Sequence, residues 1–249
     1  MKKSNQSGLS IIIPTFNEIE NVNALFQKII VFDSRVTFKY EIIIVDGNSS
    51  DGTSELIRKN INDSNLSTVK LVLSDRAEGY GADIWLGLSS AIHDLLAWTH
   101  ADLQTDLLDL IKGHDIADEN LNKKVLIKGN RKSRSIFDSM LTFGMSVLVL
   151  IKLRVWITDI NAQPKIFCRK LFNEISKLKT VPKDFSLDLF LLVEAMERCY
   201  DIKTFNVYFL KRQFGTAKGG GGSIANRIKL IKRTLSYISD LSKKRGLDL

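Results

Sequence analysis

The chain has 249 residues, of which 44% are hydrophobic and 26% are charged, and its net charge is +8. This composition is ordinary for a soluble globular protein with one large domain. Its two cysteines, Cys168 and Cys199, have no metal-ligand spacing and form no disulfide framework. The cysteine usage therefore excludes a disulfide-rich scaffold and fits a reducing compartment such as the cytoplasm.

The positive charge is concentrated toward the C-terminus. Eleven Lys or Arg residues and only two Asp residues lie between positions 203 and 249, and the rest of the chain is nearly neutral. A neutral body with a basic tail indicates a local anionic partner, and we expect an anionic membrane surface. A non-catalytic RNA-binding or scaffolding protein is the alternative, but the aromatic interleaving typical of nucleic-acid platforms is missing, so we expect no nucleic-acid partner.

The sequence predicts no membrane span. The longest uncharged run, 139–151, is shorter than the roughly 20 apolar residues that a spanning helix needs. Near the N-terminus, Pro14, Asn17 and Glu18 interrupt the apolar stretch, so no signal peptide is evident. We expect a protein that is peripheral at the cytoplasmic face of the membrane.

Predicted strands and helices alternate along the chain. Strands are predicted at 9–14, 40–46, 68–73, 94–99, 124–129 and 202–210. Helices are predicted at 18–32, 51–60, 80–92, 106–120, 136–154, 168–179, 185–200 and 224–245. Alternation of this kind through residue 130 is the pattern of βαβ units, so we expect an α/β fold with a Rossmann-like, mostly parallel sheet flanked by helices.

Three polar motifs each follow a predicted strand. They span Ser10 to Glu18, Tyr40 to Gly52 and Leu95 to Gln104. The preceding runs are β-branched with both faces apolar, which is typical of buried parallel strands. Because ligands of open α/β sheets bind beyond the carboxyl ends of the strands, we expect the three motifs to form one site.

The third motif contains a candidate metal site. Asp102 and Gln104 lie two residues apart, so in an extended segment their side chains point the same way, and His100 shares that face. A carboxylate, an amide oxygen and an imidazole can hold Mg²⁺ or Mn²⁺, and the imidazole favours Mn²⁺.

Two predicted helices have ambiguous faces. Residues 136–154 are apolar nearly all round, which indicates either a buried helix or one at a membrane interface. The last helix has a stripe of apolar residues from Ile224 to Leu241, flanked by basic residues such as Arg227 and Arg233. It either docks on the sheet with a solvated basic face or lies on an anionic lipid surface.

The ordered series of motifs resembles the family 2 glycosyltransferases, most closely the dolichol- or polyprenol-phosphate mannosyltransferase branch. The matching segments are Pro14-Thr15-Phe16-Asn17-Glu18, Val45 to Thr53, Arg76 with Gly79 to Ala82, His100-Ala101-Asp102-Leu103-Gln104, Gly129-Asn130-Arg131, Asp159 with Pro164 to Phe167, and Arg212 to Gly215 with Lys218. The resemblance implies a GT-A fold over residues 1–223, with 136–156 as a membrane-interface helix and 224–249 as a basic amphipathic helix.

The resemblance also implies roles for individual residues. The donor nucleotide site comprises Pro14, Phe16, Asn17, Glu18, Asp46, Ala101 and Lys218. Asp102 and Gln104 bind the cation that bridges the donor diphosphate. Arg131 and Arg212 offset phosphate charge, because guanidinium groups grip phosphate bidentately. The family has Asp where His100 stands, so His100 is either a metal ligand or a water-mediated contact, or it indicates an altered metal choice or a loss of activity.

The reaction implied is inverting transfer of a sugar from a UDP- or GDP-sugar to a polyprenyl phosphate. That acceptor is already ionised and needs no general base, whereas the alternative acceptor, a sugar hydroxyl of a cell-surface glycan, needs one. Asp188 is the candidate base. A dinucleotide-dependent oxidoreductase is disfavoured, because no Gly-X-Gly-X-X-Gly follows the first strand.

Overall fold

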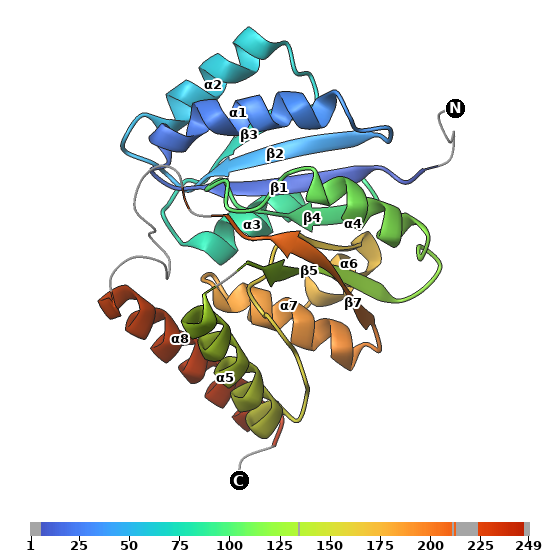
Figure 1. Cartoon of the computed structure of the whole chain (residues 1–249), viewed down its shortest axis with the longest axis vertical. Helices are drawn as coiled ribbons and strands as arrows, with labels where there is room; N and C mark the ends of the chain where they lie inside the picture. The colour runs from blue at the N-terminus through green and yellow to red at the C-terminus, as the bar shows by residue number, and fades with distance from the viewer. Residues whose placement is uncertain (1–5, 134, 211, 213–223, 247–249) are drawn as a thin grey trace.

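The computed structural model describes residues 6–133, 135–210, 212 and 224–246. A single seven-stranded sheet with the order β3-β2-β1-β4-β6-β5-β7 organises the fold (Figure 1). Its strands are β1 (Leu9–Thr15), β2 (Tyr40–Asp46), β3 (Val69–Leu73), β4 (Leu95–Trp98), β5 (Val125–Lys132), β6 (Lys165–Cys168) and β7 (Asp201–Tyr208). All neighbouring pairs are parallel except the two that involve β6, which confirms the predicted mostly parallel sheet.

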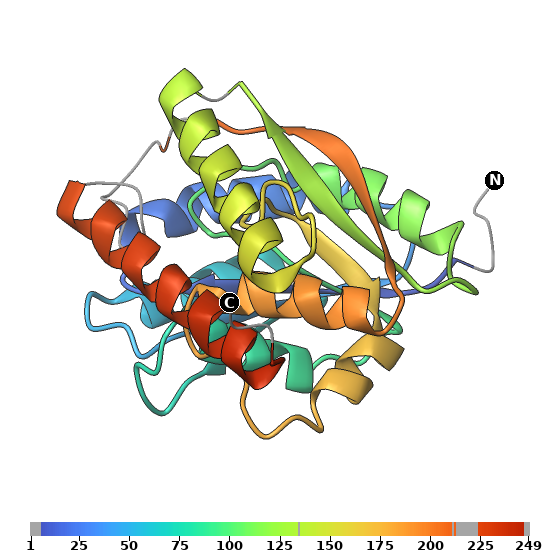
Figure 2. The ribbon, with the colours of Figure 1, turned by 90° about the horizontal axis from the view of Figure 1, so that it is seen from below.

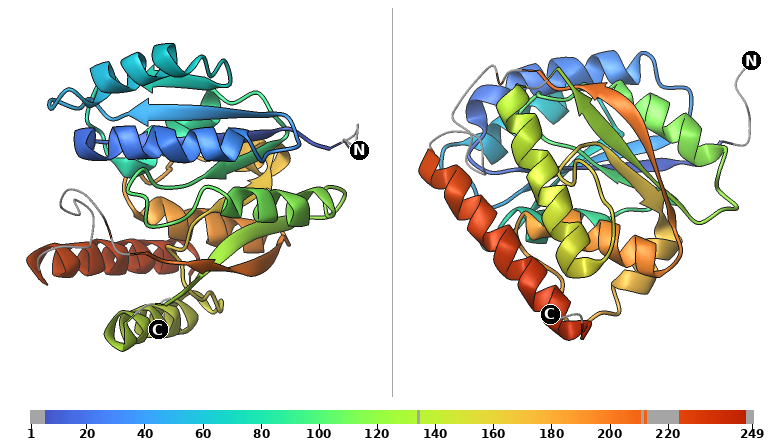
Figure 3. Two further views of the ribbon diagram at one scale, coloured as in Figure 1. Left: turned by 45° about the horizontal axis from the view of Figure 1, so that its top comes forward. Right: turned by 60° about the horizontal axis from the view of Figure 1, so that its bottom comes forward.

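Helices cover both faces of the sheet (Figures 2 and 3). One face packs against α1 (Ile19–Asp33), α2 (Thr53–Ser64) and α4 (Asp109–Asp118). The other packs against α3 (Tyr80–Ser89), α6 (Arg169–Ile175) and α7 (Ser186–Glu197). Ile11 and Ile13 of β1 point to the first layer and Ile12 points to the second, and all three are fully buried. Each buried isoleucine contributes about 1.5–3 kcal/mol of hydrophobic stabilisation, which explains why β1 is apolar on both faces.

The sequence reading missed β6. This strand has four residues and lies antiparallel between β4 and β5, with Ile166 opposite Ala97 and Ile127. The prediction instead began a helix at 168, because a four-residue run that opens with Lys165 is too short and too polar at its start to read as a strand. The strand matters for the site because it separates β5 and β7 from the first four strands.

Two long helices, α5 (Ile136–Leu153) and α8 (Ile224–Lys244), pack against each other below the sheet (Figure 1). The Oγ of Ser242 donates a hydrogen bond to the carbonyl of Lys152 at 3.1 Å, and Ile238 is buried against the core. Helix α8 therefore packs against α5 and α7. The side chains of residues 224–230, including Arg227, lie outside the described residues.

The length and apolar composition of helix α5 do not match the expectation that no segment could span a membrane. Among the described residues it is the one helix long and apolar enough to cross a membrane by length and composition, and only 17% of it is buried. The helix is longer than the uncharged run 139–151 on which that expectation was based, because Asp138 and Lys152 also belong to it. Ser135 caps it by accepting a hydrogen bond from the amide of Asp138 at 3.1 Å.

Candidate active site

A cleft of about 1210 Å³ opens where the strands β1, β2 and β4 end. Its polar wall comes from the three motifs and its apolar wall comes from α5. The polar wall includes Pro14, Glu18, Gly47, His100, Ala101, Asp102 and Gln104, and the apolar wall includes Met140, Leu141, Phe143, Met145 and Leu148. The structure thus brings residues from the three sequence motifs to one cleft, which also reaches Arg233 of α8. The second motif contributes Gly47, while its neighbour Asp46 is buried.

An ion cluster joins the first and third motifs to the segment after β7. The Nη2 atom of Arg212 donates to the carboxylate of Glu18, at 2.6 Å from Oε1, and Nη1 of Arg212 lies 4.0 Å from Oδ2 of Asp102. Backbone hydrogen bonds hold the same segment, since the amide of Leu210 donates to the carbonyl of Gln104 at 2.8 Å. Arg212 therefore sits between two carboxylates, where an incoming phosphate can compete for it.

The predicted geometry of the metal triplet is wrong. Strand β4 ends at Trp98, and Leu103 has a φ of 61°, so the segment from 101 to 105 turns and is not extended. The amide of Gln104 donates to Oδ1 of Asp102 at 3.1 Å, and the side-chain amide of Gln104 donates to the carbonyl of Leu210 at 3.1 Å. A left-handed leucine costs about 1–2 kcal/mol, a strain of the kind found at functional sites.

His100 packs beside an aromatic pair at the floor of the cleft. Its ring stacks on Tyr80 with 5.5 Å between centroids, and Tyr80 stacks on Phe185 at 4.4 Å. Burial raises the pKa of Tyr80 well above its usual value, and the nearby Asp188 adds to the shift. Tyr80 therefore stays a neutral hydroxyl at the floor of the cleft.

The residues present fit a divalent cation that is shared with a bound diphosphate. Among the described residues, no group of three His, Cys, Asp or Glu side chains is placed to hold a metal ion by itself. Asp102 offers one hard carboxylate on the cleft wall. Mg²⁺ and similar ions are often held by one or two carboxylates together with water and phosphate oxygens, so a single protein carboxylate suffices when the ligand brings its own phosphates.

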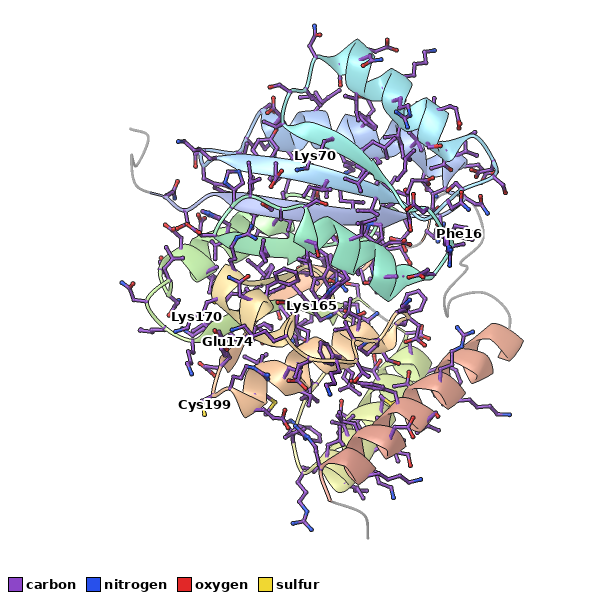
Figure 4. The ribbon with its side chains drawn as sticks, turned by 180° about the vertical axis from the view of Figure 1, so that it is seen from behind. Phe16, Lys70, Lys165, Lys170, Glu174 and Cys199 are labelled. Atoms are coloured by element: carbon purple, nitrogen blue, oxygen red, sulfur yellow. The ribbon has the colours of Figure 1, made fainter. Side chains whose placement is uncertain are left out.

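The carboxylate of Asp46 fixes the loop after β2 through hydrogen bonds. Asp46 is buried and accepts hydrogen bonds from the amide of Ser49 at 3.0 Å, from Oγ of Ser49 at 2.5 Å, and from Oγ1 of Thr15 at 3.4 Å. The side-chain oxygen of Asn17 accepts from the amide of Ser50 at 2.8 Å. Asp46 and Asn17 therefore hold the first two motifs together. Phe16, labelled in Figure 4, is 42% exposed and lines the cleft.

Arg131 is neutralised within the protein. Its backbone amide donates to Oδ2 of Asp159 at 2.8 Å, its Nε donates to Oδ1 at 2.9 Å, and its guanidinium lies 5.1 Å from the ring centroid of Phe209. Burial acts to raise the pKa of Asp159, but the hydrogen bonds and charge of Arg131 outweigh it and the pKa is lowered. Arg131 still lines the cleft, yet much of its charge is already paired.

A buried ion pair lies beneath the cleft. The Nζ of Lys165 and the Nε2 of Gln163 both donate to Oδ1 of Asp188, the latter at 2.9 Å, and Lys165 lies deep inside the molecule (Figure 4). Burial lowers the pKa of Lys165, against the opposing charge of Asp188. Oδ2 of Asp188 has no hydrogen-bond partner within the described part of the chain. The sequence analysis placed Lys165 in a segment that matches the family but gave it no role in the site.

Two further residues complete the account of the sequence predictions. Lys218 lies outside the described residues. Asp83 of α3 lines the cleft and was not predicted. The sequence feature that could have identified Asp83 is an acidic residue inside the otherwise small and apolar segment from Gly79 to Trp85.

This arrangement, a mostly parallel sheet with a polar cleft at its carboxyl edge, is the architecture of the GT-A glycosyltransferases. Glucosyl-3-phosphoglycerate synthase from Mycobacterium tuberculosis, solved with Mn²⁺, UDP and its product, superimposes with a TM-score of 0.71 at 14% identity, over 98% of this chain and 81% of that chain. A mannosyltransferase from Pyrobaculum calidifontis, solved with GDP-Man and Mn²⁺, gives 0.61 at 17% identity, over 95% and 70%. These likenesses confirm the fold.

Residues 10–122 match the family model described as glycosyl transferase family 2, in agreement with the resemblance seen in the sequence. A curated relative is the undecaprenyl-phosphate 4-deoxy-4-formamido-L-arabinose transferase of Yersinia pestis (strain Pestoides F), which is 32% identical over 124 residues. The match covers 50% of this chain and only 38% of that relative.

Proposed function

We propose that this protein is a metal-dependent inverting glycosyltransferase that moves a sugar from a nucleotide-diphosphate sugar to a polyprenyl phosphate. The observation that carries the proposal is the two-sided cleft. Its polar wall holds Asp102 and Arg212 in reach of a diphosphate, and its other wall is the apolar side of α5. A donor with a diphosphate and an acceptor with a lipid tail need these two surfaces side by side.

The donor half of the cleft would act by electrostatic stabilisation of the leaving nucleoside diphosphate. A cation of the Mg²⁺ or Mn²⁺ type, held by Asp102, supplies positive charge to that group when bound. Arg212 would exchange its contact with Glu18 for a phosphate oxygen, because guanidinium–phosphate pairs are bidentate and strong. We expect Asp46 and Phe16 to contact the nucleoside, with Gln104 and His100 beside the cation.

The acceptor half of the cleft would hold the lipid phosphate. Met140, Leu141 and Leu148 offer an apolar surface for the first isoprene units, and Arg233 of α8 offers charge for the phosphate. The phosphate oxygen attacks the anomeric carbon without a general base, because it is already ionised at neutral pH.

The same helix pair supports a peripheral position at the cytoplasmic face of the membrane. Ile136 is 82% exposed, Met140 67% and Phe137 62%, all in the first two turns of α5. Lys232 and Arg233 of α8 are exposed. An apolar face with basic residues nearby is the composition of segments that lie in the interface of anionic membranes.

A second candidate is transfer to a sugar hydroxyl, and one observation favours it. Asp188 lines the cleft, and its buried Oδ2 has no hydrogen-bond partner in the described residues, so it could accept the proton of a hydroxyl acceptor. The pairing of Oδ1 with Lys165 instead assigns Asp188 a positioning role in the lipid-phosphate reaction.

The experiment measures sugar transfer from labelled UDP- and GDP-sugars to undecaprenyl phosphate in vesicles, and to soluble oligosaccharides, with Mg²⁺ or Mn²⁺. Lipid-linked product that persists at a tenth or more of the parental rate in Asp188→Asn supports the polyprenyl-phosphate reaction. Product on the oligosaccharide alone, lost by at least about 100-fold in Asp188→Asn, supports the second candidate, because removal of a general base costs that much. Absence of product with both acceptors overturns both.

A further inference from the structure

Asp83 lines the cleft, and the proposed reaction gives this residue no role. It lies in the first turn of α3, it is 4% exposed, and it lines the cleft beside Gly47 at the end of β2. A Cβ atom placed on Gly47 would lie 2.6 Å from Oδ2 of Asp83. The missing side chain at position 47 therefore makes room for this carboxyl group next to Asp46.

One oxygen of this group is left without a partner. Oδ1 of Asp83 is buried and accepts no hydrogen bond within the described residues. Buried polar atoms are hydrogen-bonded in the great majority of cases, and an exception on the wall of a ligand cleft is an atom that a ligand can satisfy. Asp46, the neighbouring carboxylate, already accepts from Ser49 and Thr15.

The surroundings favour the neutral acid form of Asp83. Burial is the main cause that raises its pKa to about 7, the charge of Asp46 adds to the shift, Glu78 adds a little more, and a hydrogen bond from Ser74 opposes it. The backbone carbonyl of Lys183 accepts from the amides of Gly81 and Ala82 at the start of α3, and its Nζ is already paired with Glu78 at 2.8 Å. A second buried negative charge beside Asp46 and a bound diphosphate is unfavourable, so the proton is best placed on Asp83.

We propose that Asp83 is a donor-binding residue that contacts the nucleoside of the sugar nucleotide in its protonated form, as a hydrogen-bond donor. This inference rests on the proposed function, because it requires a sugar nucleotide in the cleft with its nucleoside near Asp46. Each nucleobase and the ribose carry acceptor atoms, so the contact serves affinity and orientation for the donor. Loss of the proton removes the hydrogen bond and adds a repelling charge, and donor binding therefore weakens as the pH rises.

The test is calorimetric binding of UDP-glucose and GDP-mannose with Mg²⁺ between pH 5.5 and 8.5. Sugar nucleotides are used because their diphosphate has no group that titrates near neutrality. We expect the affinity of the parent protein to fall by about tenfold from pH 6 to pH 8, in proportion to the protonated fraction of a group that titrates near 7. Asp83→Asn keeps a donor in place of the acid, so its affinity stays constant across this range.

Two further measurements separate the possible explanations. The exposed Asp63→Asn on α2 is the matched control and follows the parent. In the parent at pH 8, titrations in two buffers with different ionisation heats should show uptake of nearly one proton on binding, a result that needs no variant to fold. His100 also lines the cleft, and a dependence on pH that persists in Asp83→Asn assigns the titration to another group and overturns the inference.

The outcomes also separate this inference from the proposed function. Binding of a sugar nucleotide with equal affinity at pH 6 and pH 8, and without proton uptake, overturns the role of Asp83 and leaves the proposed function intact. Failure of both sugar nucleotides to bind at any pH overturns the proposed function together with this inference.

Discussion

Helices α1 and α5 are both long and rich in apolar residues, but the protein uses them in opposite ways. α1 buries Val22, Leu25, Phe26 and Ile29 against the sheet. α5 leaves most of its apolar side chains exposed or facing the cleft. The apolar surface of α5 is therefore not required by the core, and we propose lipid as its contact.

The contrast between the two helices predicts different costs for the same substitution. Phe26→Ala in α1 should lower the free energy of unfolding by about 3–5 kcal/mol, because it opens a cavity in a closed core. Phe137→Ala in α5, where the side chain is exposed, should change it by less than about 0.5 kcal/mol. Urea unfolding followed by circular dichroism measures both. A cost above about 2 kcal/mol for Phe137→Ala would show that α5 is part of the core after all.

Two ion pairs, one buried and one exposed, extend the comparison between interior and surface to charged side chains. Lys165→Met leaves Asp188 buried without its cation and should cost about 3 kcal/mol or more of stability. Lys183→Met breaks an exposed pair with Glu78, which water and salt screen, and should leave the stability nearly unchanged. Thermal unfolding of the two variants side by side gives the difference, and equal losses would contradict the burial that separates them.

The membrane contact can be tested on the same helix pair. Replacement of Ile136 and Met140 by Ser should reduce sedimentation with anionic vesicles while leaving the melting temperature within about 2 °C of the parent. Lys232→Gln with Arg233→Gln should weaken binding at low salt by about 2 kcal/mol, since each basic residue near such a surface is worth about 1 kcal/mol. If both variants sediment as strongly as the parent, neither α5 nor α8 contributes to membrane binding.

The sheet was largely predictable from the sequence and the site only in part. Runs such as Tyr40–Asp46 are set by local patterning, and the structure reproduces that strand. The turn at Leu103 was not predictable, because it depends on hydrogen bonds between Gln104 and Leu210, more than 100 residues apart in sequence. Asp83 and Lys165 acquire their character from burial, which composition does not reveal. The docking of α8 on α5 likewise depends on tertiary contacts.

The most direct test of the account is the metal dependence of nucleotide release from a sugar-nucleotide donor by Asp102→Ala and His100→Asp. Asp102→Ala should lose at least about 100-fold in turnover, equivalent to about 3 kcal/mol of barrier, because Asp102 is the carboxylate that our proposal gives the cation. His100→Asp should keep turnover and shift the preference from Mn²⁺ toward Mg²⁺. Near-parental turnover in Asp102→Ala, or a parent protein that EDTA does not inhibit, would contradict the metal-dependent transfer proposed for this cleft.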